Sequence, residues 1–177
     1  TPQHGVTIIE GIRRHLGDQV DVRYAEGSRI TETRGRTSFA LWKEEQVVLP
    51  DPDEEAARIA EAVALVRSAD VAVLVLGENE QTCREGWSRT HLGDRDSLDL
   101  PGNQELLLRA VVETGTPTVL VLVNGRPLSI NYAVEHVPAI VEAWYPGQEG
   151  GTAVAEVLFG AINPSGKLPI TFPRNVG

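Results

Sequence analysis

The chain has 177 residues, of which 41% are hydrophobic and 23% charged, a composition typical of a folded domain with its own core. Its net charge of −9, without a Lys/Arg block, argues against a nucleic-acid partner or an anionic membrane surface. The single cysteine, Cys83, excludes an intramolecular disulfide, and no apolar run approaches the ~20 residues that span a bilayer. The chain starts at Thr1 and contains no methionine, so we expect sequence upstream of it.

The first fifty residues predict one capped helix and little other regular structure. Thr7 and Glu10 have the spacing of a capping box, apolar residues follow at helical spacing, and Gly17 is a natural stop. Residues 20–24 alternate as a strand does, and a short strand is predicted at 46–49. Because no strand precedes the first helix, we expect a further N-terminal strand of the same sheet.

The rest of the chain alternates between apolar strands and capped helices. Strands are predicted at 71–76, 118–123 and 139–143, of which the first two have the continuous apolar pattern of strands covered on both faces. Helices are predicted from the cap Asp51 to Val66 and at 104–114, 129–136 and 152–159. The Pro-bounded segment 167–172 is predicted as an edge strand.

This alternation predicts an α/β fold. We expect a three-layer sandwich with a mostly parallel sheet of about five to six strands, helices on both faces and an antiparallel edge strand at the C-terminus. Residues 1–177 are expected to form a single α/β sandwich domain that belongs to a larger chain.

The long stretch at residues 78–102 has no periodicity and is the main candidate for function. Structureless loops of this length are uncommon in compact domains and are usually functional or disordered. The stretch holds glutamates, aspartates, arginines and Trp87, a mixture that suits sugar binding and proton transfer. On the residues alone, a solvated charged loop explains it equally well. The ligand-binding edge of a parallel sheet lies at the carboxyl ends of its strands, and this stretch follows one of them.

Five sequence blocks resemble glycoside hydrolase family 3, the β-glucosidase and β-xylosidase group, and specifically its C-terminal α/β sandwich domain. They are Gly77-Glu78-Asn79-Glu80 with Arg84-Glu85-Gly86, the run 94–104, Asn124-Gly125-Arg126-Pro127, the run 144–151, and the run 163–169. The blocks follow the order of the family over about residues 71–173.

The resemblance implies a two-domain, retaining exo-β-glycosidase, with β-glucosidase ahead of β-xylosidase. A barrel domain of the same polypeptide carries the nucleophilic aspartate, and the present segment supplies the general acid/base and part of the sugar-binding cleft. A β-linked glucoside or oligosaccharide is the expected partner. No cofactor and no metal are expected, and a homodimer is compatible with the sequence. A periplasmic or secreted location is expected, with the cytoplasm as the other option.

The resemblance also implies which residues act. Glu85, in the Glu85-Gly86 pair, matches the acid/base position; Glu80 is the runner-up and Glu78 the third choice. Glu78 stands at the end of a strand, where hydrogen bonds to loop backbone are the better assignment. The competing interpretation of Glu85 is an ion pair with Arg84 or Arg89.

Two further residues of the loop are candidates for the substrate site. Trp87 would stack on a sugar face or pack beneath the loop, and Arg95 would contact the substrate. For Arg95 we prefer a pairing with Asp94 that pins the loop. Seven residues separate Gly86 from Asp94, more than in many members of the family, and this insert leaves the register of Glu85 and Arg95 open.

Two alternatives to this enzyme remain. One is an N-acetylglucosaminidase of the same family, against which the glutamate-rich loop argues. The other is a non-catalytic α/β domain that binds a ligand or has only a structural role.

Overall fold

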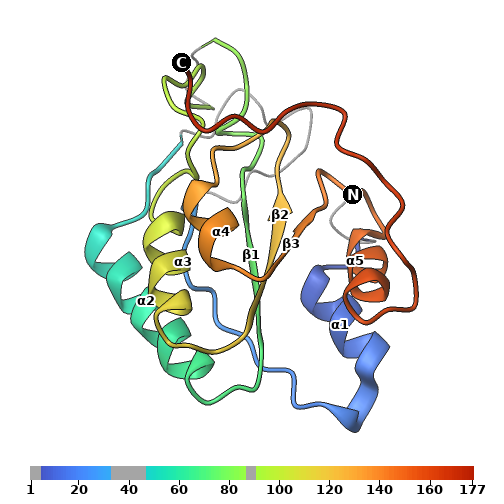
Figure 1. Cartoon of the computed structure of the whole chain (residues 1–177). Coiled ribbons are helices and arrows are strands. Elements are labelled where there is room, and N and C mark those ends of the chain that lie inside the picture. The colour runs from blue at the N-terminus through green and yellow to red at the C-terminus, as the bar shows by residue number, and fades with distance from the viewer. Residues whose placement is uncertain (1–4, 33–46, 87–90) are drawn as a thin grey trace. The chain divides into compact units, whose positions relative to one another are not determined.

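The computed structural model describes residues 5–32, 47–86 and 91–177 (Figure 1). The chain forms two compact units, which we describe separately. The first consists of Thr1–Tyr24 and Tyr145–Thr171, and the second of Ala25–Trp144 and Phe172–Gly177. No helix in the described part of the chain is long and apolar enough to cross a membrane.

The first unit is built on two helices, α1 (Ile8–Leu16) and α5 (Gly150–Leu158), with a 3-10 turn at Gly17–Gln19 after α1. The predicted capping box is confirmed: the Thr7 hydroxyl accepts from the Glu10 backbone N–H at 3.3 Å, and the Glu10 carboxylate accepts from the Thr7 backbone N–H at 2.9 Å. The two helices touch through glycines, since a Cβ on Gly11 would lie 2.0 Å from the Gly151 carbonyl oxygen. A Cβ on Gly151 would lie 2.1 Å from the Thr7 carbonyl oxygen, and one on Gly150 would lie 2.5 Å from the Pro146 ring. Close approach of α1 and its cap therefore explains Gly11 and Gly151, and the turn before α5 explains Gly150.

The second unit contains a parallel sheet. Its strands β1 (Ala72–Gly77), β2 (Thr118–Val123) and β3 (Ala139–Glu142) lie in the order β1-β2-β3. Leu76 is paired with Leu122, which in turn is paired with Glu142. The carboxyl ends of the three strands therefore meet at one edge of the sheet, which positions the loops that follow them.

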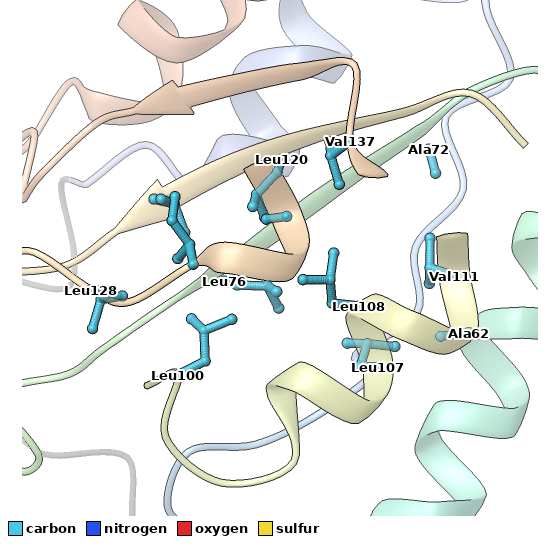
Figure 2. Close-up of a cluster of buried hydrophobic side chains, with 13 residues drawn as sticks. Ala62, Ala72, Leu76, Leu100, Leu107, Leu108, Val111, Leu120, Leu128 and Val137 are labelled. Carbon is cyan, nitrogen blue, oxygen red and sulfur yellow. The ribbon is translucent and has the colours of Figure 1, made fainter. Parts of the chain in front are cut away.

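Helices α2 (Pro52–Val66), α3 (Gln104–Val112) and α4 (Asn131–His136) pack with this sheet. Figure 2 shows the core between helices and strands, in which Leu107, Leu108 and Val111 of α3 share one buried cluster with Leu76 and Leu120 of the strands. Leu108 and Leu120 are fully buried. The α/β class is confirmed, and so are the capped start of α2 at Asp51 and the bounds of β2.

Several predicted strands are not formed. Residues 20–24 form no ladder, and the Val22 carbonyl instead accepts a hydrogen bond from the Arg13 guanidinium at 3.2 Å. Residues 47–49 also form no strand, and Gln46 lies outside the described residues. The segment 167–172 is irregular and forms no strand.

The sheet in the described residues thus has three parallel strands, and neither a sheet of five to six strands nor the antiparallel edge strand is confirmed. The apolar run of β1 is also less covered than its sequence predicts, since Val75 is 43% exposed. A continuous apolar pattern marks a strand but does not measure how much of each face is buried.

Candidate active site

The site begins where β1 ends, at a position that only glycine fits. Gly77 has a φ of 150°, and a Cβ there would lie 1.9 Å from the Val123 carbonyl oxygen of β2. Its backbone is held by the side chain of Gln104 at the start of α3. That amide accepts from the Gly77 N–H at 2.8 Å and donates to the Gly77 carbonyl at 2.7 Å. The exit of the chain from β1 is therefore fixed in direction.

The next residue, Glu78, has a fully buried carboxylate between two arginines. Arg95 donates to Glu78 Oε1 at 3.0 Å, and the Nε of Arg126 donates to both carboxylate oxygens at 3.1 and 3.2 Å. Both arginines also donate to backbone: Arg95 to the Asp99 carbonyl at 2.7 Å, and Arg126 to the Thr82 carbonyl. We call Glu78, Arg95, Arg126 and these two carbonyls the Glu78 cluster.

The Glu78 cluster ties together both halves of the long loop and the loop after β2. A buried carboxylate needs such partners, because an unpaired buried charge costs several kcal/mol. The expected role of Glu78 in structuring the loop fits this arrangement, although its partners are guanidinium groups and not backbone N–H groups. Arg95 contacts Glu78, so the preferred pairing of Arg95 with Asp94 is wrong in its partner.

A tight turn at residues 79–82 follows Glu78. The Asn79 side-chain oxygen accepts from the backbone N–H groups of Gln81 and Thr82 at 3.0 and 3.2 Å, as in an Asx turn. The buried Thr31 hydroxyl, from the segment before α2, contacts this turn: it donates to the Gln81 side chain at 2.7 Å and accepts from the Asn79 side chain at 3.1 Å. The turn is thus held by its own Asx hydrogen bonds and by the contacts of Thr31.

Glu85 lies three residues beyond this turn and is exposed. Within the part of the chain that the structure describes, its carboxylate takes part in no hydrogen bond or ion pair. The next residue, Gly86, has a φ of 63°, and its N–H donates to the Asp94 carboxylate at 3.2 Å. Asp94 therefore closes the loop across the insert that the sequence contains.

The other candidates are placed differently. Glu80, the runner-up, forms an ion pair with Arg84 at 2.9 Å. Trp87 and Arg89 lie outside the described residues. Among the described residues, no group of three or more His, Cys, Asp or Glu side chains is arranged to hold a metal ion.

A second carboxylate at the same edge was missed by the sequence analysis. Glu142 ends β3, and its Oε1 accepts from the Trp144 backbone N–H at 2.9 Å. Trp144 has a φ of 52°, unusual for a residue other than glycine. Burial raises the pKa of Glu142, against the opposing effect of the N–H groups of Trp144 and Asn124. The available signal was a glutamate that ends an otherwise apolar strand.

The comparisons with known proteins agree on one family. The family model described as the glycosyl hydrolase family 3 C-terminal domain matches residues 1–177. A periplasmic β-glucosidase of Salmonella typhimurium is 45% identical over 172 residues, covering 97% of this chain and 22% of that protein. A β-xylosidase of Formosa agariphila is 39% identical over 176 residues, covering 99% of this chain and 21% of that protein.

A solved structure agrees with these sequences. A β-glucosidase from Erythrobacter marinus has a TM-score of 0.87 at 42% identity, over 97% of this chain and 23% of that chain. The chain thus spans about a fifth of the length of each of these relatives. From its sequence and its fold alike, the chain belongs to glycosyl hydrolase family 3, whose C-terminal domain it matches along its whole length.

Proposed function

We propose that this chain is the α/β sandwich domain of a two-domain, retaining exo-β-glycosidase, with Glu85 as the general acid/base. The barrel domain of the same polypeptide would supply the nucleophilic aspartate. The substrate would be a β-glucoside, in keeping with the β-glucosidases among its relatives. The relative named a β-xylosidase leaves a β-xyloside as the second choice.

One observation carries this proposal: an exposed carboxylate follows a tightly held turn at the carboxyl edge of a parallel sheet. The carboxylate of Glu78 forms ion pairs with two arginines and that of Glu80 with one, whereas the Glu85 carboxylate is exposed. A general acid/base must reach the glycosidic oxygen and later a water molecule, so a carboxylate that is open to solvent suits the task.

The chemistry follows from the retaining mechanism. The nucleophile attacks the anomeric carbon while Glu85 donates its proton to the departing oxygen. Glu85, now ionised, then takes a proton from the water that releases the sugar from the nucleophile. The two carboxyl groups must lie about 5–5.5 Å apart for this, so both domains are needed. We therefore expect no hydrolysis by residues 1–177 alone.

The roles of the remaining loop residues follow from their contacts. Arg95 and Asp94 hold the loop through Glu78 and Gly86, so we assign them to loop structure. Trp87 is proposed as a stacking surface for a sugar ring, because the flat apolar face of an indole ring suits the apolar face of a sugar. A periplasmic location is proposed from the Salmonella relative.

The test is the stereochemistry and the substrate preference of the full-length polypeptide. Phenyl β-glucoside and phenyl β-xyloside would be compared by kcat/KM, and the first sugar product followed by proton NMR. The proposal predicts β-anomer as the first product and a preference for the glucoside. An initial α-anomer would refute the retaining mechanism. Absence of turnover on both glycosides would favour the non-catalytic alternative.

A further inference from the structure

We propose that Arg126, on the loop after β2, is a positioning residue for Glu85. The inference rests on the proposed function, in which Glu85 is the acid/base, and goes beyond it by assigning a role to a residue on a different loop. Arg126 would act through its contact with the Thr82 backbone, without touching the substrate.

The geometry supporting this inference is a two-ended contact of one guanidinium group. The Nε of Arg126 donates to both oxygens of Glu78, and one terminal nitrogen donates to the Thr82 carbonyl. Glu78 starts the loop and Thr82 ends the turn that precedes Glu85. Arg126 thus spans the turn and fixes its two ends relative to each other.

The backbone of Arg126 is held beside the end of β2. Asn124 follows β2 directly and is fully buried, and its side-chain NH₂ group donates to the Arg126 carbonyl at 2.8 Å. The Arg126 side chain is itself only 26% exposed. The backbone of Arg126 is therefore held against the edge of the sheet, and its side chain transfers that position to Thr82.

The contact calls for arginine in particular. Its planar group presents several N–H donors at fixed angles, so a carboxylate and a carbonyl can be bound together. A lysine at this position has one compact charged end and reaches either Glu78 or Thr82 firmly, but not both.

The effect on Glu85 follows from distance along the chain. Only Cys83 and Arg84 separate Thr82 from Glu85. If the turn relaxes, the exposed Glu85 carboxylate moves with it, and a displacement of about 1 Å from the reacting atoms can cost about 10²-fold in rate. Losing Arg126 should therefore weaken proton donation more than substrate binding.

The experiment uses the leaving-group dependence of the full-length polypeptide. Dinitrophenyl β-glucoside releases a stable anion that needs no proton, whereas phenyl β-glucoside releases a basic one that does. Arg126→Ala is expected to lower kcat/KM for the phenyl glucoside by about 10- to 100-fold. The loss for the dinitrophenyl glucoside should be less than about threefold, since the nucleophile and the sugar contacts remain. Equal losses for both substrates would overturn the inference.

Two further variants serve as controls. Arg126→Lys covers the case in which the alanine variant does not fold, and its phenyl-to-dinitrophenyl ratio should lie between those of wild type and Arg126→Ala. Arg109→Ala removes an arginine of α3 that forms an ion pair with Glu105 and stacks on Tyr132. It should leave the ratio unchanged.

A readout independent of activity separates this inference from the proposed function. Hydrogen–deuterium exchange of the peptide that covers residues 78–86 should become faster in Arg126→Ala or Arg126→Lys and stay unchanged in Arg109→Ala. Unchanged exchange in the Arg126 variants overturns the positioning role, whatever the activity. If Glu85→Ala steepens the leaving-group dependence and Arg126→Ala does not, the proposed function stands and this inference fails.

Discussion

Two stretches of one loop, residues 78–82 and residues 85–86, use the same kind of side chain in opposite ways. Glu78 is buried, and its carboxylate is bound by two arginines, whereas Glu85 is exposed and lies seven residues later. The first stretch is held to the sheet edge, to the loop after β2 and to Thr31. The difference distinguishes a carboxylate that holds the loop from an exposed carboxylate, which we propose as the acid/base.

Glu55 shows that the first arrangement is a general structural device in this chain. It is buried on α2, and it accepts from the Ser28 hydroxyl at 2.6 Å, the Arg29 backbone N–H at 3.1 Å and the Arg58 guanidinium at 2.7 Å. These contacts fasten the segment around Ser28 to the helix. Glu78 does the same for the loop after β1, next to the proposed chemistry.

The largest effect is expected for Glu85→Ala. In the full-length polypeptide, kcat/KM for phenyl β-glucoside should fall by about 10²- to 10⁴-fold, the usual contribution of a general acid/base. The thermal midpoint should stay within about 2 °C, because the side chain is exposed. A large loss of stability with little loss of rate would assign Glu85 to structure and reverse the comparison.

Glu78→Ala should have the second largest effect, on stability. It leaves two partly buried guanidinium groups without their carboxylate, which should lower the free energy of unfolding by about 3–5 kcal/mol. Urea denaturation measures this, with Glu78→Gln as the control that keeps the side-chain shape and one acceptor. A cost below about 1 kcal/mol for Glu78→Ala would contradict the structural importance of the cluster.

Glu80→Ala sharpens the choice between the two candidate acids. The ion pair of Glu80 with Arg84 is partly exposed, so its loss should change the free energy of unfolding and the activation free energy by less than about 0.5 kcal/mol each. The corresponding change in kcat/KM is a factor of about two. A loss of rate as large as that of Glu85→Ala, with rescue by azide, would make Glu80 the acid/base.

The smallest effect concerns Glu142 and its dependence on pH. Because burial raises the pKa of Glu142 above the ordinary value of about 4.3, the folded state holds this proton more tightly than the unfolded state. Its contribution to stability is therefore largest below pH 4 and declines as the pH rises through the raised pKa. Glutamine does not titrate and keeps the oxygen that accepts from Trp144.

At pH 7, Glu142→Gln should therefore have a Tm up to about 1–2 °C above that of wild type. At pH 4 this difference should disappear. Thermal denaturation at the two pH values measures the difference. A wild type that gains on the variant as the pH rises would mean that the N–H groups of Trp144 and Asn124 outweigh burial.

The sequence predicts the local elements of this fold better than its tertiary pairing. The caps at Thr7 and Asp51 and the strand Thr118–Val123 are local signals, and each is confirmed. Residues 20–24 alternate like a strand, but strand formation requires a neighbour with free donors and acceptors, which a single segment does not reveal.

The same limit applies to the site. The glutamate-rich loop is visible as a long stretch without period, and its Gly77-Glu78 start is placed correctly. The partners of Glu78 come from residues 17 and 48 positions away, so spacing alone pointed to the neighbour Asp94 for Arg95. Arg126 appeared only as a member of a motif, and its proposed role depends on the register of β1 and β2, which brings the loops after these strands together.

The most direct test of the central claim is azide rescue of the full-length Glu85→Ala variant on an activated aryl β-glucoside. Azide attacks the glycosyl–enzyme intermediate without a general base, so it should restore turnover and yield the β-glucosyl azide. That product would identify Glu85 as the acid/base of a retaining enzyme. A variant that stays fully active without azide, or that is inactive and remains so with it, would contradict the assignment.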